Sequence, residues 1–305
     1  MDHVAVVVLS WNGREDTLQC LESLRNVDYR PLTPIVVDNG STDGTSEAVR
    51  AAFPEVDIVR TEENLGFAEG NNVGMRRALE LGADYVLVLN NDVEVDPGFV
   101  APLVEEARGR PEAGALCSKI LYMEPDDLIW FAGATFDPRS GYNGRQIGYR
   151  ERDDGRFEDV TETDRACGAA MLVSREVLEQ VGLFDAELFF YSEDVDWSLR
   201  ARDVGYRHYV VPASKLWHKV SVTSGGENSP TTLYYGVRNT TAVCERFAPL
   251  GRLGTWRRRS VLLAAHLAQA LRSSRKREGI AAVLQGWRDF RRNRFAKRPL
   301  RGALT

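Results

Sequence analysis

The chain has 305 residues, 43% of them hydrophobic, and a formal net charge of −5, so it is long enough for one large domain with an appendage. No secretory signal pattern opens it, and no stretch reaches the roughly 18 apolar residues of a transmembrane helix, which argues against a secreted or membrane-spanning protein. The cysteines are far apart and lack metal-ligand spacing: Cys20, Cys117, Cys167 and Cys244. We therefore expect a soluble protein of the reducing cytoplasm.

The first 120 residues alternate short apolar runs with amphipathic segments, a pattern typical of an α/β domain. Strands are predicted at residues 4–9, 33–37, 56–60 and 85–89. Helices are predicted at residues 14–26, after residue 45, up to residue 81, and from Asp96-Pro97 onward. The last of these has an N-cap aspartate and a proline in its first turn.

The second half of the chain is less uniform. Residues 121–165 are rich in charge and turn formers, and they precede a predicted strand at 167–174, a short helix at 175–181 and an ordered block at 188–206. From about Ser229 the pattern becomes helical, because apolar residues recur at helical spacing. Two stripes show this: Leu263, Leu267 and Leu271, and then Ile280, Val283, Leu284 and Trp287.

The charge is unevenly distributed along the chain. Residues 251–305 contain 15 Lys or Arg against only Glu278 and Asp289, a balance of +13, which leaves −18 for the preceding residues. An acidic body with a basic tail indicates that the two parts have different partners.

Polar clusters follow three of the predicted strands. They are Ser10-Trp11-Asn12, Asp38-Asn39-Gly40-Ser41 and Asn90-Asn91-Asp92. In open parallel sheets, ligands bind beyond the carboxyl ends of the strands. We therefore expect the three clusters to line one crevice.

Two aspartates in these clusters have side chains suited to a nucleotide ligand. Asp92 follows a strand that is apolar on both faces, where a carboxylate can hold a hard divalent cation together with diphosphate oxygens. Asp38 can accept a hydrogen bond from a ring N–H of uracil or thymine. Each aspartate can instead form a turn or cap the next helix, and for Asp38 alone that interpretation is favoured.

The segment from Asn64 to Gly74 places glycines at a helix start, where unpaired N–H groups suit phosphate. It matches neither the dinucleotide-binding glycine pattern nor the Walker pattern, so an NAD or ATP site is unsupported. Further along, Ser192-Glu193-Asp194-Val195-Asp196-Trp197 packs carboxylates closely, which suits a general base, although a solvated helix start has the same composition. His218 is more typical of a structural histidine unless the fold returns it to Asp92.

Taken in order, these segments resemble a known family. The runs LSWN, VVDNGSTDGT, NLGFAEGNNVG, VLVLNNDV, FFYSEDVDWSLR, LWHKVSVTSGG and YYGVRN extend over about residues 3–245. They are similar to the family 2 glycosyltransferases of the GT-A fold, and more narrowly to the branch with bacterial rhamnosyltransferases and related cell-wall or polysaccharide transferases. The resemblance implies an α/β fold with a mostly parallel sheet flanked by helices.

The resemblance also implies an activity. It is the inverting transfer of a sugar from a nucleotide diphosphate to a glycan or lipid-linked acceptor. L-Rhamnose from dTDP-rhamnose is the first expectation, followed by a hexose or galactofuranose from a UDP-sugar. The implied domains are a catalytic domain at residues 1–228, with a nucleotide-binding half (about 1–120) and an acceptor-binding half (about 121–228), and a basic helical extension at 229–305.

Site residues follow from the matched motifs. Asp92 matches the last aspartate of the DXD-type motif that binds Mg²⁺ or Mn²⁺, and Asn90 replaces the first; His218 matches a histidine that completes the metal site. Asp38 matches the aspartate that recognises the pyrimidine base. The other expected donor contacts are Ser10, Asn12, Gly66, Asn72 and Asn91.

The acceptor side is implied in the same way. Asp194 matches the catalytic base, and Glu193 is expected to orient either the acceptor or Asp194. Trp197 is expected to stack on a sugar ring, with core packing as the alternative, and Arg238 is also expected on the acceptor side.

The basic tail leaves several interpretations open. Basic clusters beside amphipathic helices favour an anionic membrane surface, so the protein is expected to be cytoplasmic and peripheral at the inner face of the plasma membrane. A helical appendage packed on the acidic body and a homodimer contact are the alternatives. Nucleic-acid binding is not expected, because no motif supports it.

Two other functions are compatible with parts of the sequence. A non-catalytic nucleotide-sugar or glycan-binding protein would have the same fold, but such a protein would tend to lose one of Asp92, Asp194 and His218. A nucleotidyltransferase would need a Gly-rich loop bearing Lys or Arg after the first strand, and Leu9 to Gly13 does not supply it.

Overall fold

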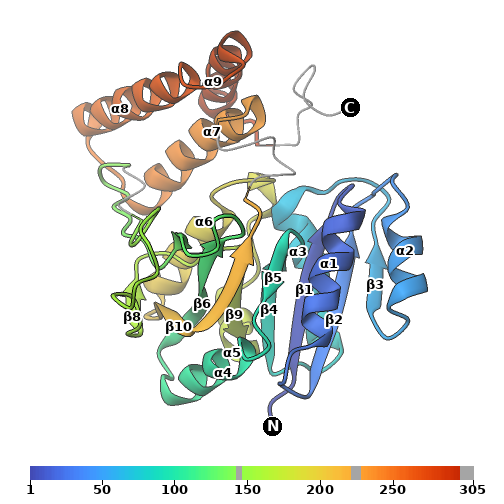
Figure 1. Ribbon diagram of the computed structural model, residues 1–305. Coiled ribbons are helices and arrows are strands. Elements are labelled where there is room, and N and C mark those ends of the chain that lie inside the picture. Colours follow the sequence, from blue (N-terminus) through green and yellow to red (C-terminus); the bar gives the residue numbers. More distant parts are fainter. Residues whose placement is uncertain (142–145, 221–227, 296–305) are drawn as a thin grey trace.

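The computed structural model describes residues 1–141, 146–220 and 228–295. Within these residues the strands form one ten-stranded sheet, with helices on both faces and a helical extension beyond one end (Figure 1). The strands are β1 (Val4–Ser10), β2 (Leu32–Asp38), β3 (Asp57–Arg60), β4 (Tyr85–Asn90), β5 (Val93–Val95), β6 (Ala113–Tyr122), β7 (Ile129–Phe131), β8 (Thr161–Thr163), β9 (Ala170–Ser174) and β10 (Arg207–His218).

The sheet has the strand order β3-β2-β1-β4-β9-β6-β10-β5, with β7 beside β6 and β8 beside β10. Strands β3, β2, β1 and β4 are parallel, whereas β9 runs antiparallel between β4 and β6. From β1 the chain goes to β2 on one side and later to β4 on the other. This reversal creates a crevice at the carboxyl ends of β1 and β4. The expected α/β class with a mostly parallel sheet is confirmed.

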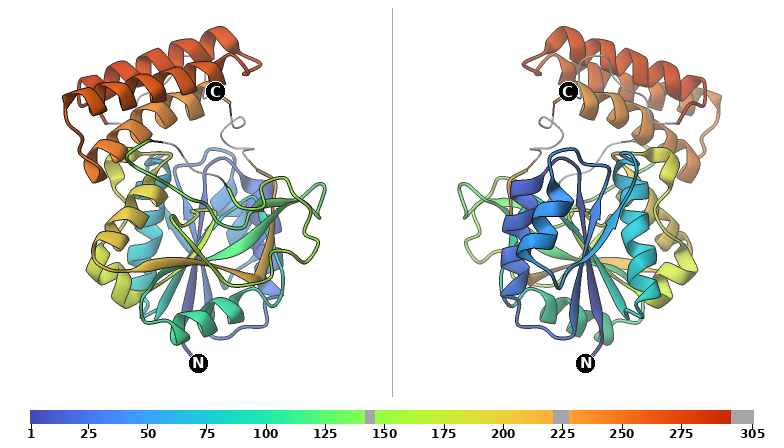
Figure 2. Two further views of the ribbon diagram at one scale, coloured as in Figure 1. Left: turned by 90° about the vertical axis from the view of Figure 1, so that its left-hand side faces the viewer. Right: turned by 90° about the vertical axis from the view of Figure 1, so that its right-hand side faces the viewer.

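The sheet is covered by short amphipathic helices, and α1 and α3 lie on opposite faces (Figure 2). Six helices precede the extension: α1 (Arg14–Arg25), α2 (Thr45–Ala52), α3 (Gly66–Glu80), α4 (Val100–Gly109), α5 (Arg175–Val181) and α6 (Glu193–Asp203), with a 3₁₀ turn at Ala186–Leu188. Helix α3 packs closely on the sheet at Gly74, where a Cβ atom would lie only 2.2 Å from Val7 Cγ1. Strand β1 is buried because helices cover both faces of the parallel sheet, so neither face is exposed to solvent.

Some elements differ from the sequence expectation. The helix expected from Asp96-Pro97 begins at Val100, because Asp96 instead forms a turn in which its carboxylate accepts from the Gly98 amide. Strand β10 was not predicted. It contains Pro212, and its pairing with β6 is shifted between Val211 and Lys215, so its residues do not alternate regularly.

The extension consists of α7 (Pro230–Phe247), α8 (Arg252–Ala270) and α9 (Lys276–Arg291). It lies beyond the carboxyl ends of the strands, at the opposite end of the molecule from the N-terminus (Figures 1 and 2). Leu233, Val237, Ala270 and Val283 form its small core. Helices α7 and α9 approach closely, since a Cβ on Gly286 would lie 2.3 Å from the Tyr234 carbonyl oxygen.

Among the described residues, the helices are all too short or too polar to cross a bilayer. Of the predicted leucine stripe on α8, Leu263 and Leu267 pack against the extension core, whereas Leu271 is 58% exposed.

Candidate active site

A cavity of about 780 Å³ opens at the carboxyl ends of β1 and β4, where the topology predicts a crevice. Its walls come from the strand ends, the start of α3, residues 189–194, residues 228–231 and the turn between α8 and α9. The cavity therefore joins both halves of the sheet to the helical extension. Of the side chains that the sequence marked as candidates for chemistry, it contains Asp92, Glu193, Asp194 and His218.

Asp92 and His218 meet at the floor of this cavity. Asp92 follows β4, and His218 ends β10, which pairs with β5 so that His218 lies opposite Val93. His218 Nε2 is 3.0 Å from Asp92 Oδ1 and 3.3 Å from Asn90 Nδ2. Trp130 packs edge-on against the imidazole, with 4.7 Å between ring centroids. The fold thus returns the histidine to Asp92, although 126 residues separate them.

This pair fits a divalent cation as part of its coordination shell. Both side chains are buried, and the Nδ1 atom of His218 has no hydrogen-bond partner among the described residues. A carboxylate oxygen and an imidazole nitrogen suit Mn²⁺ or Mg²⁺ only when further oxygen ligands come from elsewhere. Among the residues described, no group of three or more His, Cys, Asp or Glu side chains is arranged to hold a metal ion, so an ion held by Asp92 and His218 would need its other ligands from elsewhere.

Residues 189–192 form a strained loop that leads into α6. Phe189, Tyr191 and Ser192 all have positive φ angles, of 61°, 68° and 71°. Such angles are unfavourable for residues with a Cβ atom, so neighbouring groups must hold them. The buried Asn239 of α7 does this: its Nδ2 donates to three carbonyl oxygens of residues 188, 190 and 191, at 2.7 to 2.9 Å.

The two carboxylates after this loop have different surroundings. Glu193 is 6% exposed and lines the cavity, and its Oε2 has no hydrogen-bond partner in the described structure. Burial, and then the neighbouring charge of Asp194, raises the pKa of Glu193 well above its ordinary value. Asp194 accepts from the Gly168 amide at 3.1 Å and lies 3.9 Å from Arg165. When two adjacent carboxyl groups have different surroundings, one can stay protonated while the other is ionised and able to accept a proton.

On the expected nucleotide side, Asp38 is not among the residues that line the cavity. Asp38 is fully buried, its Oδ1 accepts from the Ser41 amide at 2.8 Å and its Oδ2 accepts from the Ser46 hydroxyl. It closes the turn before α2 and does not reach the cavity. The next residue, Asn39, does line the cavity, because successive residues leaving a strand point in opposite directions.

Three other expected donor contacts also lie outside the cavity. Ser10 is buried and accepts from Thr17, and Asn12 accepts from the Thr42 amide. Asn72 is 3% exposed and forms two hydrogen bonds with the Phe184 backbone. These side chains hold loops and helices in place. Gly66 and Asn91, in contrast, line the cavity.

The phosphate site expected at the start of α3 is corrected as well. The amides of Phe67 and Ala68 both donate to the Phe189 carbonyl oxygen, at 2.6 and 3.2 Å. The first-turn N–H groups that would bind phosphate are therefore used to attach the strained loop. At Gly66, with φ of 84°, a Cβ would lie 2.4 Å from that same oxygen.

Both residues expected on the acceptor side are internal. Trp197 is 1% exposed and its indole N–H donates to the Gly182 carbonyl, so it is a core residue that cannot stack on a sugar. Arg238 is fully buried and donates to the Leu188 carbonyl at 2.9 Å, so it supports the loop from behind. Sequence reasoning instead missed Arg272 and Arg275, which line the cavity from the extension. Only the basic composition of the tail pointed to them.

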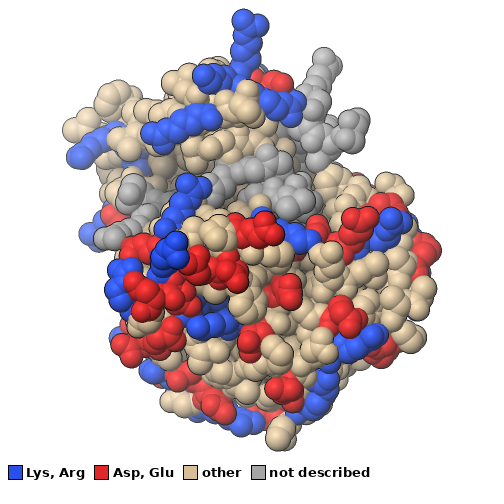
Figure 3. All heavy atoms as spheres, in the orientation of Figure 1, with Lys and Arg blue, Asp and Glu red and all other residues tan. Residues whose placement is uncertain are grey.

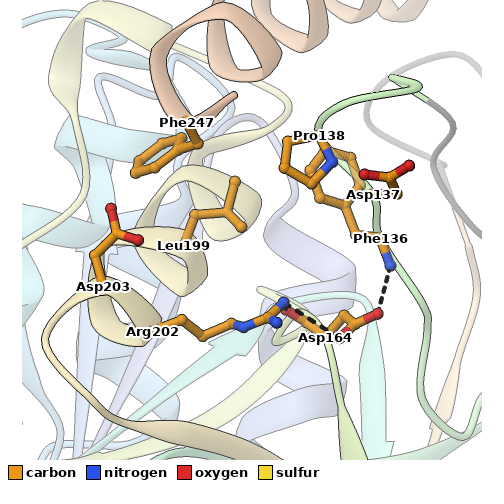
Figure 4. Close-up of a pocket in the computed structure, with 8 residues that line it drawn as sticks. All are labelled: Phe136, Asp137, Pro138, Asp164, Leu199, Arg202, Asp203 and Phe247. Atoms are coloured by element: carbon orange, nitrogen blue, oxygen red, sulfur yellow. Dashed lines mark hydrogen bonds and ion pairs between the residues drawn. The ribbon is translucent and has the colours of Figure 1, made fainter. Parts of the chain in front are cut away.

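A second cavity of about 450 Å³ lies elsewhere, between α6, the end of α7 and residues 136–138 (Figure 4). Its polar wall is an ion pair between Arg202 and Asp164 at 3.2 Å, and Asp164 also accepts from the Phe136 amide. None of the predicted site residues lines it. The first cavity is therefore the candidate active site.

Solved structures share this architecture. The chain superposes on GalNAc-T7 with UDP, GalNAc and Mn²⁺ with a TM-score of 0.65 and 16% identity, covering 96% of this chain and 56% of that one. It superposes on the mannosyltransferase PcManGT of Pyrobaculum calidifontis, in complex with GDP-Man and Mn²⁺, with a TM-score of 0.60 and 18% identity, covering 95% and 87%. The superpositions place the chain in the GT-A fold.

Sequence comparison places the chain more narrowly. The profile of glycosyl transferase family 2 matches residues 5–182, and the chain belongs to that family. It is 27% identical to the N-acetylglucosaminyl-diphospho-decaprenol L-rhamnosyltransferase of Mycobacterium tuberculosis (strain CDC 1551 / Oshkosh), over 91% of this chain and 97% of the relative. It is also 27% identical to the dTDP-rhamnosyl transferase RfbF of Shigella flexneri, over 78% of each.

Proposed function

We propose that this glycosyltransferase uses a divalent cation to transfer L-rhamnose from dTDP-rhamnose, with inversion, to a lipid-linked acceptor in the synthesis of a cell-wall or surface polysaccharide. Glycosyl transfer follows from the family, and the names of the two relatives support the donor and acceptor. The observation that carries the mechanism is that the Asp92–His218 pair and the Glu193–Asp194 pair line one cavity.

Asp92 and His218 would hold Mg²⁺ or Mn²⁺. The bound ion supplies Lewis-acid stabilisation of the negative charge on a diphosphate leaving group. Asn39, Gly66 and Asn91 line the same cavity and are the donor contacts that the geometry favours. Trp130 packs against the imidazole of His218 and limits its rotation.

Asp194 is the proposed base in a single displacement. Its carboxylate takes the proton of the acceptor hydroxyl, whose oxygen forms a bond to the anomeric carbon while the bond from that carbon to the diphosphate oxygen breaks. The Gly168 amide and Arg165 keep the carboxylate in place. Burial raises the pKa of Glu193, and in its protonated form this residue would donate a hydrogen bond to the acceptor and orient it.

The base assignment is tested with Asp194→Asn. We expect transfer to be lost while nucleotide binding persists, because the amide fills the same space and cannot take the proton. Asp203→Asn, an exposed change near the end of the same helix, is the control and should keep wild-type activity. Transfer by the Asp194→Asn variant at the wild-type rate would show that another group is the base.

Donor and metal are tested together by thermal unfolding with a panel of nucleotide sugars, with and without Mn²⁺. A ligand that binds only the folded state raises the melting temperature, so we expect dTDP-rhamnose with Mn²⁺ to give the largest shift. Asp92→Asn should lose the Mn²⁺-dependent part of that shift, and Asp96→Asn should keep it. A full Mn²⁺ effect in Asp92→Asn contradicts the metal assignment.

A measurement of dTDP release, beside the thermal shift, distinguishes an enzyme from the non-catalytic alternative. A binding protein would show the shift with dTDP-rhamnose and never release dTDP, even with acceptor present. Release of dTDP that depends on Asp194 is the outcome that supports an enzyme.

We also propose that the extension contacts an anionic membrane surface. The described helix α8 has no acidic residue, and its outer side exposes Leu253 (79%), Trp256 (67%) and Val261 (54%) beside Arg257. Figure 3 shows Lys and Arg gathered on the extension and most Asp and Glu on the sheet domain below it. Apolar anchors among cations suit the headgroup region of an anionic bilayer.

Vesicle flotation tests this surface. The protein should float with vesicles that contain anionic lipid, and Trp256→Ser should weaken flotation, whereas Val204→Ser, an exposed apolar change on the sheet domain, should not. Dimerisation in solution that Trp256→Ser abolishes, without any flotation, would assign the surface to a second copy of the chain instead.

A further inference from the structure

The turn between α8 and α9 is part of the active-site cavity. Helix α8 ends at Ala270 and α9 begins at Lys276, and the residues between them that line the cavity are Arg272, Ser273, Ser274 and Arg275. The extension therefore contributes to the wall of the cavity, and two of these four residues are arginines.

The turn presents positive charge toward the cavity. Arg272 has no ion-pair partner among the described residues, whereas the charge of Arg275 is partly offset by its ion pair with Glu278. Helix α9 starts directly after Arg275, so the positive end of its dipole lies at the turn. The other Asp, Glu, Lys, Arg and His residues on the cavity wall are Asp92, Glu193, Asp194 and His218. The turn is thus the cationic edge of an otherwise acidic cavity.

The position of the turn assigns it to the acceptor rather than the donor. The extension packs on the loop that carries the base: Tyr234, Tyr235 and Ala282 form one cluster with the aromatic side chains of residues 189–191. The donor diphosphate has its own place at Asp92 and His218. An anionic group close to the turn is therefore attached to the molecule whose hydroxyl reaches Asp194.

We propose that Arg272 and Arg275 bind the diphosphate of the acceptor, so that the acceptor is a sugar linked through diphosphate to a lipid. This inference rests on the proposed glycosyl transfer. Guanidinium groups bind phosphate oxygens through charge-assisted hydrogen bonds. Leu271, which directly follows α8 and is 58% exposed, offers an apolar contact for the lipid next to Arg272.

The test uses farnesyl diphosphate, with farnesol as its uncharged counterpart. Titration calorimetry is done in EDTA, so that binding through a divalent cation does not contribute. We expect farnesyl diphosphate to bind the wild-type protein measurably more tightly than farnesol. Arg272→Gln should weaken it about tenfold, equivalent to about 1.4 kcal/mol. Arg277→Gln, at an exposed arginine that does not line the cavity, is the matched control and should change little.

A second titration distinguishes the two diphosphates. Binding of dTDP with Mn²⁺ should be the same in the wild-type protein and in Arg272→Gln. If Arg272→Gln weakens dTDP as much as farnesyl diphosphate, the turn serves the donor and the inference is wrong. Equal losses in Arg272→Gln and Arg277→Gln also overturn it, because they show attraction to overall charge.

Failure of the proposed function gives a different result. If no nucleotide sugar binds or turns over but farnesyl diphosphate still depends on Arg272, the lipid diphosphate site stands and the transfer reaction does not. If transfer proceeds but the binding of farnesyl diphosphate does not depend on Arg272, the transfer reaction stands and the lipid diphosphate site does not.

Discussion

Replacing Asn239 with leucine removes the donor that holds the strained loop before the base and keeps nearly the same side-chain volume. Asn239 is fully buried, and its amide donates to three carbonyl oxygens of residues 188–191. The change should release the loop without opening a cavity. Asn239 does not line the active-site cavity, so it is a positioning residue.

The size of the effect follows from these contacts. A buried hydrogen bond contributes about 1 kcal/mol net, and the amide has two N–H groups to share among the three carbonyl oxygens, so the contacts together hold the loop by about 2 kcal/mol. Against them stand three residues with positive φ, each of which costs about 1–2 kcal/mol. Removing about 2 kcal/mol lets the strained conformation relax, and the population of the productive loop falls about thirtyfold, since 1.4 kcal/mol is tenfold.

The assay measures kcat for sugar transfer, affinity for dTDP with Mn²⁺, and the melting temperature. We expect Asn239→Leu to lower kcat about thirtyfold, with dTDP affinity nearly unchanged because Asp92 and His218 are untouched. Thr241→Val is the control: it lies on the same helix, and its hydroxyl donates only to the Val237 carbonyl of that helix.

Two results would refute this reasoning. Unchanged kcat in Asn239→Leu would show that the loop conformation does not depend on the amide. Equal loss of kcat, dTDP affinity and melting temperature in both variants would show a general loss of folding.

Other changes test the environment of the site and its scaffold. The melting temperature of Glu193→Gln, relative to that of the wild type, should rise between about pH 5 and about pH 8. The reason is that the pKa of Glu193 is raised in the folded state, so the stability of the wild type falls as the pH rises through that pKa. A difference that does not depend on pH would contradict the burial effect. Gly74→Ala should lower the free energy of unfolding by about 1–3 kcal/mol in urea, since the new Cβ would meet Val7 at 2.2 Å. Gly109→Ala, with nothing within 4 Å, is its control, and equal effects would mean that the α3 contact is not tight.

The sheet and the place of the site were predictable from the sequence because buried parallel strands appear in it as continuous runs of apolar residues. Strand β1 was expected at residues 4–9 and spans Val4–Ser10. The polar residues directly after β1, β2 and β4 then had to meet at one edge of the sheet. This argument fixes where a side chain starts and not which way it points. Asp38 and Asn39 are neighbours, and only Asn39 reaches the cavity.

The remaining features depend on contacts between distant segments. Nothing local in β10 shows that it pairs with β5 and brings His218 beside Asp92. Residue type also misleads where amphipathic side chains are buried: Trp197 and Arg238 look suited to a sugar but satisfy backbone carbonyls in the interior. Arg272 was one cation among many in the tail until the turn placed it in the cavity.

The hydrogen bonds from the start of α3 to the Phe189 carbonyl have a kinetic consequence. One oxygen atom joins the helix whose first residues line the nucleotide side of the cavity to the loop that precedes the base. A nucleotide that settles against Gly66 and Phe67 therefore also fixes the start of the base loop. We expect the substrates to bind in a compulsory order, donor first, and dTDP to inhibit competitively against the donor and non-competitively against the acceptor.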